Sequence, residues 1–324
     1  GPPHTMALPT NTFATYSAIG NREDLSDMIY RIDPVDTPFN SGVEKVKATA
    51  VNHEWQTQAL AAAAANAQIE GDDAVADSAT ATVRLGNYTQ ISRKVPQVSG
   101  TQQAVEHAGR DNEMAYQEML KGLELKRDME LIIAGSNTAK VAGSANVART
   151  TASVLSWIKS NTSKGTAGGA ADPTTADGLG TRTDGTQIAF TESRLKTVLS
   201  AIWTAGGKPD TIMTGAFNKQ IFSTFTGRAS PIEQASTKKI TASVDAYESD
   251  FGVLKVVANR FSRSRDVLVL QMDMWALAFL NGRKMVSIPL AKTGDSERKE
   301  VLSEYALEAR NEKASGGVFD NTTS

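Results

Sequence analysis

The apolar positions nearest the N-terminus predict a short amphipathic helix that ends in a proline-containing turn. Four apolar side chains recur at the i, i+3, i+4 and i+7 spacing of one helical face: Leu25, Met28, Ile29 and Ile32. Pro34 and Pro38 end this pattern, because proline has no backbone N–H and its ring clashes with the preceding turn. A helix this short cannot bury its own apolar face. We therefore expect residues 6–50 to form an arm that lies on another body, in the same chain or in a second one.

Two strand-like segments follow the arm, and a long connection separates them. Residues 51–58 are rich in strand-forming side chains, and residues 79–95 alternate between polar and apolar positions. The connection contains an alanine-rich run and four acidic residues, Glu70, Asp72, Asp73 and Asp77. An isolated two-stranded hairpin is only marginally stable in water. We predict an extended hairpin over residues 51–95 that lies on something else.

The longest predicted helix covers residues 101–134 and ends before Gly135. A helix of this length would span roughly 50 Å. Its apolar stripe is narrow, and we expect its charged faces to be exposed to solvent. Lys126 and Glu130 have the i, i+4 spacing at which opposite charges attract each other. The pattern is typical of a long strut that crosses a flat body.

The second half of the chain predicts a mixed lobe with a long loop before it. Residues 143–187 are rich in Gly, Ala, Ser and Thr, and we expect a surface loop in their second half, with 154–158 anchoring its start. The helix predicted over 191–205 has an apolar face formed by Leu195, Val198, Leu199, Ile202 and Trp203. We also predict a helix at 216–225 and strands at 211–214, 239–244, 253–258, 267–271 and 277–279. Residues 299–311 are compatible with a helix or a strand, and regular alternation favours the strand.

Composition excludes several classes of protein. The chain has 324 residues, a formal net charge of −2 and no cysteine, which excludes disulfides, thiolate zinc sites and cysteine nucleophiles. No apolar run approaches the roughly 18–20 residues of a membrane-spanning helix. Residues 1–5 resemble a cloning remnant, and we expect Met6 to be the native start. We therefore expect a soluble protein that is made in the cytoplasm and has no membrane partner.

No arrangement of residues in the sequence indicates catalysis. His4, His53 and His107 lack the spacing of metal ligands, and the chain contains neither a Gly-x-Ser-x-Gly elbow nor a Walker loop. Asp250-Phe251-Gly252 matches a kinase motif without its companions, so we expect a turn in which Phe251 points inward. The sequence predicts no catalytic residue, no cofactor and no metal site.

The order of these elements, together with two short motifs, resembles one family. The segment 10–39 (TNTFATYSAIGNREDLSDMIYRIDPVDTPF) is similar to the arm of one branch of phage major head proteins. Glu312-Lys313-Ala314 followed by Gly316-Gly317 is similar to the end of their returning strand. The chain thus resembles the major capsid proteins of tailed double-stranded DNA bacteriophages, which have the Hong Kong 97-type α+β fold.

The resemblance implies a division of the chain and a role for its parts. It implies an N-terminal arm (6–50), an extended loop (51–95), a peripheral domain with a long spine helix (96–190 and 291–319), a mixed α/β axial domain (191–290) and a tail (320–324). It implies a structural protein, not an enzyme, that assembles as pentamers and hexamers into an icosahedral phage head in the host bacterial cytoplasm. A separate scaffolding protein, a portal and weakly, non-specifically contacted double-stranded DNA are the expected partners.

The family role also implies which residues contact neighbouring subunits. The expected contacts are Leu25, Met28, Ile29, Ile32, Pro34, Pro38, Phe39, Trp55, Glu70, Asp72, Asp73, Arg84 and Arg93. Some members of the family cross-link a lysine of the extended loop to an asparagine of a neighbour. Residues 51–93 contain no lysine, which argues against that chemistry here.

Two alternatives remain open at this point. The first is the shell protein of a bacterial nanocompartment, similar to encapsulins, which would share the fold and enclose cargo enzymes instead of a genome. The second is an enzyme with an unrecognised site in the lobe of residues 191–290.

Overall fold

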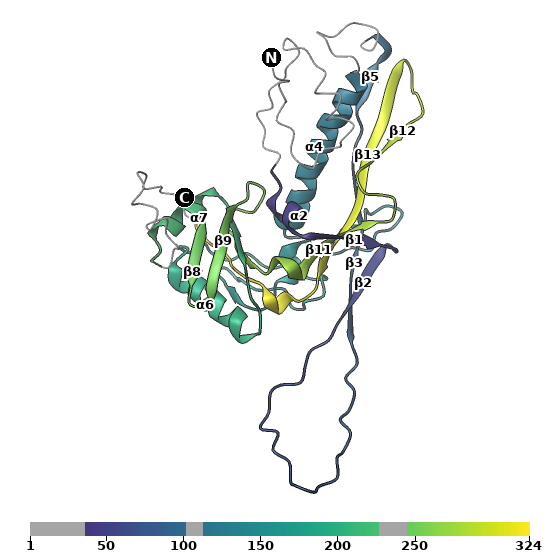
Figure 1. Ribbon diagram of the computed structural model, residues 1–324. Helices are drawn as coiled ribbons and strands as arrows, with labels where there is room; N and C mark the ends of the chain where they lie inside the picture. The colour runs from purple at the N-terminus through teal and green to yellow at the C-terminus, as the bar shows by residue number, and fades with distance from the viewer. Residues whose placement is uncertain (1–35, 102–112, 227–244) are drawn as a thin grey trace, which may run out of the picture.

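A computed structural model describes residues 36–101, 113–226 and 245–324 (Figure 1). Several expectations fall outside these ranges. They are the amphipathic helix with Leu25, Met28, Ile29, Ile32 and Pro34, the first part of the helix at 101–134, and the strand at 239–244.

The first sheet is organised around one long strand near the C-terminus. Its elements are β1 (Glu44–Ala48), β4 (Gln90–Lys94), β5 (Gln97–Ser99), β11 (Trp275–Leu280), β12 (Val286–Pro289) and β13 (Ser296–Ala309). β13 pairs with β11 and β12 and also with β4 and β5, while β1 lies parallel to β11 at the edge. The long helix α4 (Glu113–Ala134) runs beside β13 and packs on this sheet (Figure 1). The strand predicted at 299–311 is confirmed.

The second sheet forms a lobe beside the first. In order, it contains β6 (Thr162–Ser163), β14 (Gly316–Val318), β10 (Val267–Leu270), β7 (Thr211–Thr214), β9 (Gly252–Ala258) and β8 (Ala246–Ser249). The helix α6 (Glu192–Thr204) buries Leu195, Val198, Leu199 and Ile202 in the core of this lobe. The Thr191 side chain accepts a hydrogen bond from the Arg194 N–H and so caps α6. α7 (Ala216–Ile221), with the 3₁₀ turn Phe222–Thr224, matches the second predicted helix.

The predicted extended hairpin is present, and its base is a separate two-stranded sheet. β2 (Asn52–Thr57) pairs antiparallel with β3 (Val83–Tyr88). Residues 58–82 connect them as a long loop that points away from the rest of the chain (Figure 1). The strand expected over 79–95 is two strands, because the ladder to β2 ends at Tyr88 and β4 then pairs with β13 in the first sheet.

The chain crosses between the two sheets more often than the expected domain division allows. β11 and β12, expected in the axial domain of residues 191–290, pair with β13 in the first sheet. β14, expected in the peripheral domain, pairs with β10 in the second. β1, expected in the arm, is hydrogen-bonded along its length to β11. The arm therefore becomes part of the folded body before residue 50.

Three side chains differ from their expected environments. Trp203 is 59% exposed instead of buried, because at about 100° per residue it lies about 80° away from Leu195 around the helix. Phe251, expected to point inward, is also exposed and stacks on Trp203 with 5.4 Å between ring centroids. Lys126 does not pair with Glu130, whose carboxylate is buried and bonded elsewhere.

The Glu130 carboxylate joins the arm, the long helix and the second sheet. Its Oε1 accepts hydrogen bonds from the backbone N–H of Phe39 (2.7 Å) and from the side-chain amide of Asn259 (3.1 Å). Its Oε2 accepts from the backbone N–H of Asn40 (2.9 Å). Phe39 and Asn40 lie in the first turn of the short helix α2 (Pro38–Gly42), so Glu130 caps that turn from another element.

Burial raises the pKa of Glu130 to about 7, against the lowering effect of its three hydrogen bonds. A carboxyl group with a raised pKa binds its proton more tightly in the folded state than in the unfolded chain. Its contribution to stability is therefore complete below pH 4.5 and is lost as the pH rises towards and past 7.

A second buried side chain, Asn87 at the end of β3, ties the hairpin to the body. Its amide nitrogen donates to the carbonyls of Ala152 (3.1 Å) and Leu307 (2.8 Å), and its Oδ1 accepts from the N–H of Ala152 (2.8 Å). The side chain is fully buried, so these backbone groups have no access to water when it is removed.

We predict that Asn87→Ala lowers the free energy of unfolding by about 2–4 kcal/mol, because it leaves buried backbone groups without partners. Chemical denaturation of the unassembled chain measures this change. Gln58→Ala, which removes an exposed hydrogen bond to Thr80, is the control and is expected to cost less than about 0.5 kcal/mol. Equal losses in the two variants would contradict the assigned role of Asn87.

We also predict that Glu130 adds stability as the pH falls from 8 to 5, by at most ~3 kcal/mol. Denaturation curves of the wild type and of Glu130→Gln across this range isolate the effect, because the amide does not titrate. The variant's stability should change less with pH than that of the wild type. Parallel pH profiles would show that Glu130 does not titrate in this range.

Candidate subunit interface

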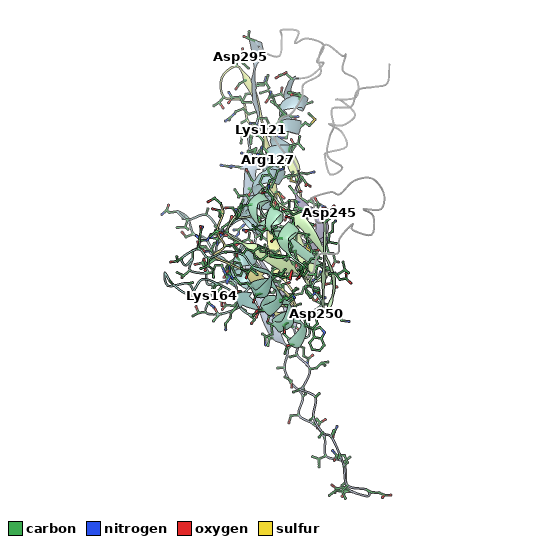
Figure 2. All side chains as sticks on the ribbon, turned by 90° about the vertical axis from the view of Figure 1, so that its left-hand side faces the viewer. Lys121, Arg127, Lys164, Asp245, Asp250 and Asp295 are labelled. Carbon is green, nitrogen blue, oxygen red and sulfur yellow. The ribbon has the colours of Figure 1, made fainter. Side chains whose placement is uncertain are left out.

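The long loop at residues 58–82 is the largest part of the described chain without a packing partner in its own body. Leu60, Ile69 and Val75 are 95%, 77% and 88% exposed. Figure 2 shows this loop from the side as a thin projection with no neighbouring element. These aliphatic side chains have no cover from their own chain, so they are available to a partner protein.

The same loop carries charge of one sign only. Residues 59–82 contain four acidic side chains, Glu70, Asp72, Asp73 and Asp77, and no lysine or arginine, so the loop has a charge of −4. All four are exposed. Glu70, Asp72 and Asp73, expected as contacts with neighbours, therefore lie where a second molecule can reach them.

The base of the hairpin is fixed to its own chain. The Trp55 Nε1–H donates to the carbonyl of Ala309 (2.9 Å), and its ring lies 5.5 Å from that of Trp157 between centroids. The His53 Nε2 lies 2.8 Å from Oε1 of Glu308. Trp55, expected to touch a neighbour, is half-buried against its own body, and it holds the hairpin where the loop begins.

The carboxylate of Glu308 stays ionised at this base. Burial alone would raise the pKa of Glu308, but the hydrogen bonds from His53 and Arg310 outweigh it and hold the pKa below its ordinary value. The Arg310 Nε donates to Oε2 of Glu308 at 2.8 Å. The contact of His53 with the same carboxylate links the hairpin to the end of β13.

The remaining expected contacts divide into exposed and buried residues. Arg84 and Arg93 keep 65% of their side chains exposed, with weak ion pairs to Glu54 (3.3 Å) and Glu300 (3.9 Å). Pro38 is the first residue of α2. Phe39 is fully buried and packs edge-on against Trp275, so its side chain belongs to the core of its own chain and not to a contact surface.

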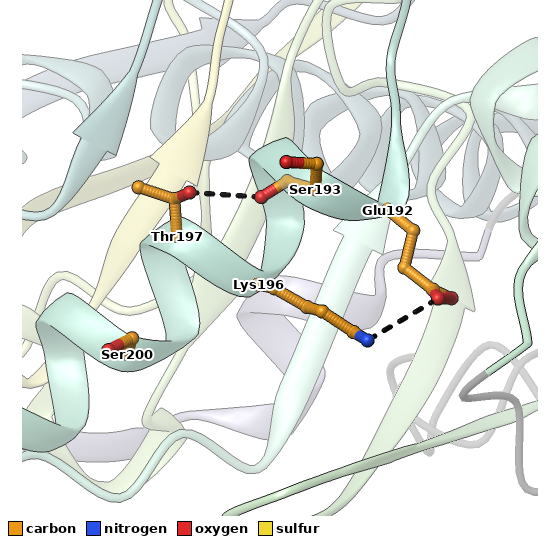
Figure 3. Close-up of a pocket in the computed structure, with 5 residues that line it drawn as sticks. All are labelled: Glu192, Ser193, Lys196, Thr197 and Ser200. Atoms are coloured by element: carbon orange, nitrogen blue, oxygen red, sulfur yellow. Dashed lines mark hydrogen bonds and ion pairs between the residues drawn. The ribbon is translucent and has the colours of Figure 1, made fainter.

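The outer face of α6 is a surface that the sequence did not indicate. Figure 3 shows a shallow groove lined by Glu192, Ser193, Lys196, Thr197 and Ser200. The Lys196 Nζ lies 3.7 Å from Oε1 of Glu192, and the Thr197 hydroxyl donates to the carbonyl of Ser193. The groove offers hydroxyl groups and one ion pair, and no histidine or cysteine lines it. This arrangement fits a polar surface better than a catalytic centre.

Metal binding and membrane insertion find no support in the described part of the chain. Within residues 36–101, 113–226 and 245–324, no three His, Cys, Asp or Glu side chains are grouped so that they could hold a metal ion. Over the same ranges, no helix has the length and apolar character needed to cross a membrane.

The sequence matches known proteins over nearly its whole length. The model of the family described as "SU10 major capsid protein" matches residues 8–322. A curated relative, the major capsid protein of Escherichia phage Phieco32, is 28% identical over 347 residues, which cover 97% of this chain and 98% of the relative.

Solved structures with the same fold include capsid proteins and one encapsulin. A chain from the cyanophage A-1(L) capsid aligns with a TM-score of 0.60 and 12% identity, covering 92% of this chain and 96% of the other. A chain from Mycobacterium phage Bobi aligns with a TM-score of 0.56 and 11% identity, covering 92% and 95%. A chain of the SrpI encapsulin of Synechococcus elongatus aligns with a TM-score of 0.53 and 10% identity, covering 93% and 92%.

These comparisons confirm the Hong Kong 97-type fold, and they confirm that the resemblance found in the sequence was to the right family. The fold alone is shared with an encapsulin, so it does not separate a phage head from a nanocompartment. The match to the family model over residues 8–322 separates the two in favour of the phage capsid. The chain belongs to the SU10 major capsid protein family.

Proposed function

We propose that this major capsid protein assembles as pentamers and hexamers into an icosahedral head that encloses double-stranded DNA, and that its extended loop fastens each subunit to a neighbour. The fastening role of the extended loop rests on residues 58–82, which expose Leu60, Ile69 and Val75 away from the core of their own subunit. Burying aliphatic side chains is the main favourable term in protein association. A partner subunit supplies the surface that the isolated chain lacks.

The fixed hairpin base suits this role. Trp55 and Asn87 hold β2 and β3 to the body through hydrogen bonds to Ala309, Ala152 and Leu307. The direction in which the loop leaves the body is therefore set before assembly. This lowers the conformational entropy that must be lost when the loop docks.

The expected partners follow from the same proposal. We infer that a separate scaffolding protein and a portal take part in assembly in the host cytoplasm, and that the inner wall contacts DNA weakly. A formal net charge of −2 fits weak contact, because strong and salt-dependent binding to DNA needs many unpaired lysines and arginines. The role is structural, and no step of it requires turnover of a substrate.

A nanocompartment shell is the alternative, because the SrpI encapsulin has the same fold, but the match to the capsid family favours the phage head. The two candidates differ in what the shell encloses, which is DNA in a phage head and a cargo protein in a nanocompartment. Particles purified after expression alongside the other head proteins should contain nuclease-protected double-stranded DNA if the chain builds a phage head. Particles that enclose a folded cargo protein and no DNA would favour the nanocompartment.

We predict that the triple variant Leu60→Ser, Ile69→Ser, Val75→Ser folds normally and assembles poorly. Each buried aliphatic side chain contributes about 1 kcal/mol or more, so the protein concentration needed for assembly should rise at least about tenfold. Light scattering and negative-stain electron microscopy measure assembly, and thermal unfolding of the free subunit checks the fold.

A matched control removes exposed apolar side chains elsewhere. Val147 and Leu179 are 54% and 62% exposed in the Gly-rich segment, and Val147→Ser, Leu179→Ser should assemble as the wild type does. Normal assembly of the loop variant would contradict the fastening role of the loop.

A further inference from the structure

Four lysines lie around one edge of the first sheet. Lys45 and Lys47 are two residues apart in β1, so their side chains leave the strand on the same face. They pair in register with Leu277 and Phe279 of β11. Lys284 follows β11, and its Nζ lies 5.1 Å from the centroid of the Phe279 ring. β1 and the turn after β11 therefore bring the amino groups of Lys45, Lys47 and Lys284 to the same edge of the sheet.

The fourth lysine comes from the long helix. α4 covers the sheet face that carries Leu277 and Phe279, since Leu125 and Met129 belong to the same core cluster. Lys126 follows Leu125 on this helix. Its Nζ is buried and has no hydrogen-bond partner within the described residues. A buried ammonium group without a partner is costly and calls for an anion.

The cations at this edge repel one another. Burial first, and then Lys284, lower the pKa of Lys126 to about 8. The same two effects lower the pKa of Lys45, which the nearby Glu130 partly offsets. Glu130 is bonded to Phe39, Asn40 and Asn259, and the Lys45 Nζ donates to the carbonyl of Val43 at 2.8 Å. Across the described ranges, no salt bridge joins any of the four lysines to a carboxylate.

The extended loop has the complementary charge. Its four carboxylates, at Glu70, Asp72, Asp73 and Asp77, carry −4 with no cation among residues 59–82. The loop of the same chain points away from α4, so it is not placed to reach the four lysines of its own subunit (Figure 1). We propose that Lys45, Lys47, Lys126 and Lys284 form the docking site for the acidic loop tip of a second copy of this chain, an inference that rests on the proposed shell.

A protein loop fits this site better than nucleic acid does. Lys47 and Lys284 are exposed, whereas the Nζ of Lys126 is buried, so a broad and rigid duplex can pair with the first two only. The loop is a thin, irregular length of chain, and three of its four carboxylates are on the short side chains of Asp72, Asp73 and Asp77. It also brings Leu60, Ile69 and Val75, which bury apolar area as the charges pair.

The first test exchanges the charges of the two surfaces. Lys47→Glu, Lys284→Glu should lower the yield of closed shells at least tenfold, and so should Asp72→Lys, Asp73→Lys. Combining all four substitutions should restore at least half of the wild-type yield. The control is Lys208→Glu, Lys292→Glu, a reversal of two other exposed lysines, which should leave the yield unchanged. Thermal unfolding of each free subunit shows whether the fold is intact.

The second test uses the absence of cysteine from the chain. Asp73→Cys with Lys284→Cys should form disulfides between subunits under mild oxidation of assembled shells. These appear as a ladder of multimers on a non-reducing gel. The pair Asp73→Cys with Lys208→Cys is the control, and it should give no ladder.

Several results would overturn the proposal. They are a combined charge variant that is no better than either double variant, equal ladders from both cysteine pairs, and no ladder from either pair.

Lysine reversals that weaken binding to a short DNA duplex, without any ladder, would assign the site to nucleic acid. A ladder or an internal disulfide from Asp24→Cys with Lys284→Cys, and none from Asp73→Cys, would assign it to the arm. A wild-type chain that forms no shells contradicts the proposed function itself and is recognised before any variant is made.

Discussion

The buried carboxylate of Glu130 is the constraint on which the arrangement of this chain depends. One side chain of the long helix holds the first turn of α2 through two backbone N–H groups and the second sheet through Asn259. The backbone N–H of Asn259 in turn donates to the carbonyl of Thr214 at the end of β7. A carboxylate can satisfy three donors at once because it has two oxygens and no proton to donate when it is ionised. The point where the arm enters the body is therefore fixed relative to both sheets.

The two sheets are joined by shared core and by shared chain. The larger core cluster includes Met213, Leu268 and Leu270 from the second sheet alongside Trp275 and Tyr305 from the first. Along the chain, β10 and β14 of the second sheet flank β11, β12 and β13 of the first, so neither sheet is complete without the same C-terminal stretch. The chain thus behaves as one body with two lobes. This suits a capsid subunit, which must keep its conformation while several neighbouring subunits contact it.

Sequence patterns predicted the strongly periodic elements and missed those that depend on tertiary partners. The helix at 191–205 follows from spacing because it buries one periodic face. The strands at 211–214 and 299–311 were also predicted from their sequence patterns, although β7 and most of β13 are buried on both faces. β1 was missed because its sequence, EKVKA, carries three charges and so does not look like a strand. The strand forms because its backbone pairs with β11. The expected domain division did not anticipate that β11 and β12 join the first sheet and β14 the second, because periodicity does not report which sheet a strand joins.

The candidate interface shows the same limit. Composition predicted an exposed acidic loop, since four carboxylates without cations have no reason to be buried. The inward positions of Phe39 and of the Glu130 carboxylate could not be predicted, because both depend on contacts between residues about 90 positions apart in the sequence. The lysine cluster was missed for the same reason. Its members come from β1, α4 and the turn after β11, and no local pattern joins them.

The bare aliphatic side chains at Leu60, Ile69 and Val75 also have a consequence for the newly made chain. Until it meets other copies, each subunit displays an apolar, backbone-exposed strip of the kind that promotes aggregation. The free subunit thus exposes apolar area that the proposed contact between subunits would cover. Assembly in the cell should therefore keep the concentration of free subunits low. When a purification dissociates the shell, we expect the free subunits to precipitate under conditions in which they are still folded.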